Sequence, residues 1–161
     1  MKLIIDKSIV VFLDKLYLRT LEMTNQDLIK KKIIKLINKI QNLYDIDLSG
    51  YYNVFIHKDD NYGIVIDMQK EDLEYLDYFN NQVELNIEII EDSFIYKIED
   101  PFNLNRSLLS KFNIYKNGSD LYLKAKGDIS DIELGIILEN GETIYGAKAN
   151  SILKKSKIIK V

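Results

Sequence analysis

The clearest hydrophobic pattern in this chain is a helical one over residues 24–44. Apolar side chains recur there every three or four residues, which places them on one face of an α-helix. They are Ile29, Ile33, Leu36, Ile37, Ile40, Leu43 and Tyr44. Thr24, followed three residues later by Asp27, resembles a capping box that begins such a helix. The opposite face carries Lys31, Lys32, Lys35 and Lys39. The segment therefore predicts a long amphipathic helix.

The segment before this helix fits two structures. Residues 1–7 are typical of a short strand, and Ser8 can cap a first helix that continues to residue 23. Its inward positions would be Phe12, Leu13, Leu16, Thr20 and Met23. The β-branched run over residues 9–11 favours a strand instead, because branching at Cβ restricts side chains in helices.

From residue 51 the hydrophobic period changes from 3.6 to two, which predicts strands. Tyr52, Val54 and Ile56 alternate with more polar neighbours, and residues 58–63 supply a turn before the apolar run 64–66. A β-hairpin follows from this pattern. Residues 71–80 are expected to form a short acidic helix, and residues 83–90 and 94–98 a second strand pair. The middle of the chain is thus predicted to be a four-stranded antiparallel sheet.

The rest of the chain predicts a smaller, β-rich part. We expect a short helix over residues 105–112, strands over 121–126 and 132–138, and a hairpin turn at Asn140-Gly141. The tail from residue 147 is expected to form a short helix and a strand. The single proline, Pro101, marks the best boundary between an α+β domain of residues 1–100 and a subdomain of residues 101–161, although one single domain fits as well.

These elements define an α+β fold class. One long amphipathic helix, with the first helix as a second element, is expected to pack on a mainly antiparallel sheet, with the smaller β-rich C-terminal part after it.

Composition narrows the class of protein. The chain has 161 residues, a net charge of -3 and no cysteine, which excludes disulfides and thiolate metal sites and fits the reducing cytoplasm. No apolar run approaches the roughly 20 residues that span a membrane, and the first residues lack a secretory signal pattern. The abundance of Ile, Lys and Asn is typical of a bacterium with an AT-rich genome.

Charge is distributed in three blocks of alternating sign. Residues 1–45 carry nine Lys and Arg against five Asp and Glu, residues 46–100 three against fourteen, and residues 101–161 ten against six. The blocks therefore net +4, -11 and +4. Such segregation favours electrostatic recognition, either of a partner or of the complementary block within the fold or across a homodimer.

The acidic, aromatic segment of residues 71–80 is the best candidate for a partner-binding site. As a helix it would bury Leu73 and Leu76 and present carboxylates and tyrosines outward. The outward residues are Glu71, Asp72, Glu74, Asp77 and Tyr78, with Tyr75 and Phe79 near the rim, and all of these except Phe79 are the predicted partner-binding residues. Tyrosines beside carboxylates suit a basic, partly apolar protein. We therefore expect a non-enzymatic cytoplasmic interaction or regulatory protein.

Two other functions are compatible with the sequence. Lys31, Lys35 and Lys39, with the basic tail, would suit weak nucleic-acid binding, although a pI near 5.3 and the scarcity of arginine argue against it. Carboxylates around the hairpin would suit a divalent-metal hydrolase, but their spacing matches no known metal motif, so no metal site is assigned. They are Asp59, Asp60 and Asp67 at the hairpin, together with Glu84 and Glu88 on one face of a following strand.

Further signals for catalysis are weak. The sole histidine, His57, is expected to face solvent beside the hairpin turn, and Ser151 with Lys154 matches an S-x-x-K pattern without its companion motifs. No phosphate loop or nucleophile motif is present. We therefore assign no catalytic residue and no cofactor.

Overall fold

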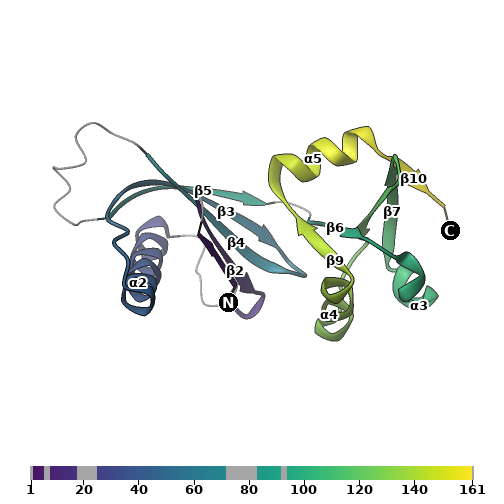
Figure 1. The fold of residues 1–161 in the computed structure, drawn as a ribbon, viewed down its shortest axis with the longest axis horizontal. Coiled ribbons are helices and arrows are strands. Elements are labelled where there is room, and N and C mark those ends of the chain that lie inside the picture. The colour runs from purple at the N-terminus through teal and green to yellow at the C-terminus, as the bar shows by residue number, and fades with distance from the viewer. Residues whose placement is uncertain (1, 6–7, 18–24, 72–82, 92–93, 161) are drawn as a thin grey trace. The chain divides into compact units, whose positions relative to one another are not determined.

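The structure is a computed structural model that describes residues 2–5, 8–17, 25–71, 83–91 and 94–160 (Figure 1). The chain divides into two compact units, which are described separately. The first comprises Met1–His57 and Gly63–Ile90, and the second Lys58–Tyr62 and Glu91–Val161. Helices and antiparallel strand pairs occur in the chain as expected, so the α+β class is confirmed.

The first unit contains a five-stranded sheet in the order β1-β2-β4-β3-β5 and one long helix, α2. Its elements are β1 (Lys2–Ile5), β2 (Ile9–Asp14), α2 (Gln26–Tyr44), β3 (Gly50–Asp59), β4 (Gly63–Lys70) and β5 (Val83–Glu91). The hairpin of β3 and β4 is confirmed. Residues 9–14 form strand β2, so for this segment the strand alternative is confirmed and the predicted first helix is wrong. The end of that predicted helix, residues 18–24, lies outside the described part.

The predicted amphipathic helix is confirmed in α2, with a shifted cap. Asn25 is the N-cap, and its side chain accepts hydrogen bonds from the backbone N–H groups of Asp27 and Leu28. Thr24, the expected cap, lies outside the described residues. Leu43 and Tyr44, expected in the core, are 62% and 55% exposed because the helix runs on beyond its last buried isoleucine, Ile40.

One hydrophobic core joins α2 to the first sheet. The helix contributes Ile29, Ile33, Ile37 and Ile40. The strands contribute alternate residues, as the period of two predicts, among them Val11, Val54, Ile56, Ile64 and Ile66. Central strand β4 is buried on both faces, since Val65 between Ile64 and Ile66 is also inaccessible.

The second unit contains a five-stranded sheet in the order β10-β7-β8-β6-β9, in which every pair of neighbours is antiparallel. Its strands are β6 (Ile95–Ile98), β7 (Phe112–Asn117), β8 (Asp120–Ala125), β9 (Gly141–Ile144) and β10 (Lys157–Ile159). Its helices are the 3₁₀ turn η2 (Pro101–Asn103), α3 (Arg106–Leu109), α4 (Asp131–Glu139) and α5 (Gly146–Lys155). The helix and strand expected in the tail are confirmed.

Three predictions in this region are wrong. Residues 94–98 do not pair with residues 83–90, because β6 lies between β8 and β9. The strand expected over residues 132–138 is helix α4, which begins at a capping box of Ser130 and Glu133. Asn140-Gly141 is not a hairpin turn: Asn140 ends α4 as its C-cap and Gly141 begins β9. The sequence interpretation also missed strand β7.

We expect the fragment of residues 101–161 to remain unfolded in isolation. It lacks β6, the strand that pairs with both β8 and β9 and buries Ile95, Tyr96 and Ile98. Without β6, strand β9 has no neighbour in the sheet. Circular dichroism during urea titration should show no cooperative transition. A sharp transition in the isolated fragment would contradict this assignment of β6.

Replacing Ile37 by alanine should destabilise the protein by about 2–5 kcal/mol, because the side chain is fully buried and the mutation leaves a cavity. The matched control in the same helix is Leu43→Ala, which should change the free energy of unfolding by no more than about 0.5 kcal/mol. Urea unfolding followed by circular dichroism measures both. Equal effects of the two substitutions would contradict the helix register.

Candidate functional site

Side chains at the end of β3 and in the turn that follows it bind backbone groups of the second unit. Asp59 Oδ1 accepts hydrogen bonds from the backbone N–H groups of Asn61 and Tyr62, and its Oδ2 accepts one from Phe94, each at 2.9 Å. The Asn61 side chain donates to the Gly127 carbonyl at 3.0 Å and accepts from the Ile129 N–H at 2.9 Å. These bonds fix residues 58–62 to the segments before β6 and α4.

Aromatic rings pack beside this hydrogen-bonded loop. Phe94 lies 5.3 Å from the ring of Tyr62 and 5.8 Å from that of Tyr145, measured between centroids. Burial raises the pKa of the Tyr62 phenol to about 12, with a smaller contribution from Tyr145. Burial also raises the pKa of Tyr96, and the negative charge of Asp59 adds to this effect. These tyrosines are therefore neutral packing groups at physiological pH.

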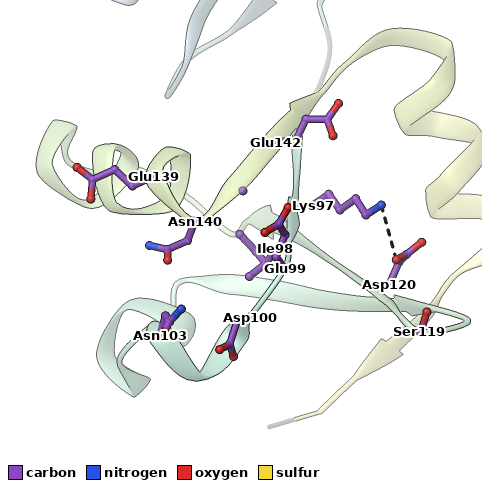
Figure 2. A pocket seen from close by; sticks show the side chains of 11 residues that line it. Lys97, Ile98, Glu99, Asp100, Asn103, Ser119, Asp120, Glu139, Asn140 and Glu142 are labelled. Atoms are coloured by element: carbon purple, nitrogen blue, oxygen red, sulfur yellow. Dashed lines mark ion pairs between the residues drawn. The ribbon is translucent and has the colours of Figure 1, made fainter.

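An acidic cavity of about 530 Å³ opens at one end of the second sheet. It lies where β6 ends and β8 and β9 begin, and the loop after β6 and the end of α4 complete its wall (Figure 2). Five of its lining residues are carboxylates, namely Glu99, Asp100, Asp120, Glu139 and Glu142. Lys97 is the one cation among the lining residues, and its Nζ lies 3.6 Å from Asp120 Oδ1. The cavity therefore carries a surplus of negative charge.

The carboxylates surround the cavity instead of converging on one point. In Figure 2 the side chains of Glu139, Glu142 and Asp100 extend in different directions from α4, β9 and the loop after β6. Within the described ranges, no group of three or more metal-binding side chains could hold an ion. A spread of negative charge suits several cationic groups of one partner better than a single bound cation.

An exposed aromatic side chain adjoins this cavity. Phe102 is 95% exposed and lies in η2 between Asp100 and Asn103, both of which line the cavity. Asp100 is the N-cap of η2, and its Oδ1 accepts the Phe102 N–H at 2.9 Å. This bond fixes the backbone of Phe102 next to the carboxylates. The sequence interpretation missed this residue, although an aromatic residue directly after Asp-Pro was available as a signal.

The candidate partner-binding residues predicted from sequence lie mostly outside the described part of the chain. Asp72, Glu74, Tyr75, Asp77 and Tyr78 are outside it. Glu71 follows β4; its N–H donates to the Tyr51 carbonyl, and its carboxylate accepts a hydrogen bond from the Asn53 side chain. Glu71 is therefore hydrogen-bonded to strand β3 of the first sheet. The binding role of the segment stays a prediction.

The lysines predicted for nucleic-acid binding are exposed on α2. Lys31, Lys35 and Lys39 are spaced four residues apart and so lie along one side of the helix, opposite its buried isoleucines. The structure thus gathers the predicted stripe. Its role in binding stays a prediction.

The residues with possible catalytic chemistry lie on several different elements. His57 is only 7% exposed, so the expectation that it faces solvent is wrong; it interrupts the alternation of β3 directly after buried Ile56. Glu84 and Glu88 are exposed on β5, and Asp67 Oδ1 is buried with no hydrogen-bond partner among the described residues. Ser151 and Lys154 are both exposed on α5.

Comparison with protein-family models, with curated proteins and with solved structures gave no match. Among the described residues, no helix has both the length and the apolar character that crossing a membrane requires.

We expect Asp59→Ala to destabilise the second unit by about 1–3 kcal/mol, because the N–H of buried Phe94 would lose its acceptor. The neighbouring Asp60→Ala serves as control, since Asp60 is exposed and its loss should cost no more than about 0.5 kcal/mol. Thermal unfolding compares the two variants. Equal stabilities would show that the carboxylate of Asp59 is not needed for folding.

Proposed function

We propose that this protein is a non-enzymatic interaction or regulatory protein that presents an acidic, aromatic surface to a basic protein partner. The observation that carries the proposal is the position of Phe102, 95% exposed beside a cavity with five carboxylates and one lysine. Exposed apolar rings are costly to leave in water and are enriched where proteins bind each other.

Charge and apolar contact have separate parts in this proposal. The carboxylates attract a cationic partner over a distance of about 8–10 Å in physiological salt. Phe102 then supplies an apolar surface, which removes area from water and slows dissociation. Because Lys97 is already paired with Asp120, it compensates only one of the five negative charges.

The acidic segment from Glu71 to Tyr78 belongs to the same proposal as a second acidic surface. Its carboxylates and tyrosines combine the same two chemical features as the cavity and Phe102. We place the protein in the bacterial cytoplasm, because a chain without cysteine fits a reducing compartment and its Lys-, Ile- and Asn-rich composition fits an AT-rich bacterial genome.

A labelled peptide of alternating lysine and leucine tests the proposal by fluorescence anisotropy. We expect it to bind the full chain and to bind more weakly as salt increases. A triple variant, Phe102→Ala with Glu139→Gln and Glu142→Gln, should bind about three- to tenfold more weakly, as expected for the loss of exposed charge and apolar contacts. Glu71→Gln with Asp72→Asn, Glu74→Gln and Asp77→Asn tests the second surface in the same way.

The matched control is Ile132→Ala, which removes a side chain that is 80% exposed on α4 but does not line the cavity. It should bind the peptide as the wild type does. If the peptide fails to bind, or if the control weakens binding as much as the triple variant, the proposal is wrong.

A further inference from the structure

The second sheet ends in a short strand that has one neighbour. Strand β10 comprises Lys157–Ile159 and pairs only with β7 among the described residues. Its other side therefore presents backbone N–H and C=O groups that another strand can pair with. Ile158 is 59% exposed and Ile159 is 37% exposed, so apolar side chains are accessible on both faces of this edge.

Two cavities lie beside this strand and share Ile158 and Ile159 as lining residues. One has a volume of about 780 Å³ and extends to α3 and the end of β8, and the other, of about 580 Å³, extends to the turn after β7. Their cationic lining residues are Arg106, Lys116, Lys126, Lys155, Lys157 and Lys160. Of the residues that the structure describes, no carboxylate lines either cavity. The β10 edge, meaning β10 with these six cations, is thus uniformly basic.

The pairing of β10 with β7 places like charges opposite each other. Lys157 is directly across from Lys116 in the antiparallel register. Like charges in this arrangement repel each other and weaken the strand pair. A negatively charged group bound near these two lysines would offset their repulsion. The strand edge therefore favours a negatively charged ligand.

From these observations we propose that the β10 edge binds an extended, acidic peptide segment of a partner protein, which adds to the second sheet as a further strand. Backbone hydrogen bonds to β10 would hold the segment, and its alternate side chains would reach opposite faces. Acidic side chains on one face lie beside Lys157, and the long side chain of Lys116 lies one strand further on the same face. Apolar side chains on the other face meet Ile158.

A peptide fits this edge better than a nucleic acid does. Single-stranded nucleic acids bind through aromatic platforms on which bases stack, together with cations. The exposed apolar groups here are isoleucines, and the one aromatic residue that lines either cavity, Phe112, is 3% exposed. Aliphatic side chains instead suit the valine or leucine of an extended peptide.

The probe for this proposal is a short labelled peptide of alternating glutamate and valine, measured with the full chain by fluorescence anisotropy. We expect it to bind, and the corresponding lysine and valine peptide not to bind this edge. A glutamate and valine peptide with a central proline keeps the charge but loses a backbone donor, so it should bind about tenfold more weakly if the peptide adds as a strand. Equal binding of the proline peptide would overturn strand addition.

The variant Lys116→Gln with Lys157→Gln locates the site on the protein. It should weaken binding of the acidic peptide by about five- to tenfold, as expected for the loss of two exposed charge contacts. Because it removes a repulsive pair, it should unfold at the same temperature as the wild type or higher. The control is Lys31→Gln with Lys35→Gln, which makes the same charge change on α2.

The outcomes separate this proposal from the alternatives. If the acidic peptide binds both variants equally, the edge is not its site, and the lysines serve only to keep β10 from pairing. If an oligothymidylate binds more tightly than the peptide and loses affinity in the Lys116→Gln and Lys157→Gln variant, the edge is a nucleic-acid site instead. The basic peptide and the Phe102 variant test a different cavity, so either proposal can fail alone.

Discussion

The hydrogen bonds of Asp59 and Asn61 are the constraint on which the second unit depends. Both side chains belong to the segment Lys58–Tyr62, and both bind the backbone of segments that follow much later in the chain, at Phe94, Gly127 and Ile129. Phe94 and Ile129 are buried, so their N–H groups need these acceptors. The bonds fix the start of β6 and the approach to α4, the two elements that form much of the acidic cavity. The unit is therefore discontinuous in sequence.

This discontinuity is not visible in the composition of the chain. Charge changes sign at Pro101, but residues 91–100, which belong to the acidic block, supply the strand that joins β8 to β9 in the second sheet. The same unit then has an acidic cavity beside β6 and β9 and a basic edge at β10. Three of the cavity's carboxylates, Asp120, Glu139 and Glu142, come from the basic block, so the sign of a block does not give the charge of each surface.

Local patterns predicted the elements whose signals were strong and whose partners were adjacent in the chain. The helical spacing of Ile29, Ile33, Ile37 and Ile40 gave α2, and alternation around a polar turn gave the hairpin of β3 and β4. The errors arose where the signal was ambiguous. In α4 the isoleucines suggested a strand, but Ser130 and Glu133 form a capping box that satisfies two backbone donors and begins a helix. That signal was present in the sequence and outweighed β propensity.

The candidate sites depend on long-range pairing, which sequence spacing does not encode. Glu99 and Glu142 line one cavity because β6 and β9 are antiparallel neighbours, with Ile98 opposite Gly141. Lys116 meets Lys157 only because β10 returns to pair with β7. The sequence indicated an acidic surface, a basic tail and a preference for recognition over catalysis. The sequence did not indicate that Arg106 and Lys126 lie near the basic tail at an open strand edge. Their position depends on the arrangement of β7, β8 and α3, which was not predicted. The basic strand edge therefore follows from sheet order, whereas the acidic character of the chain follows from composition alone.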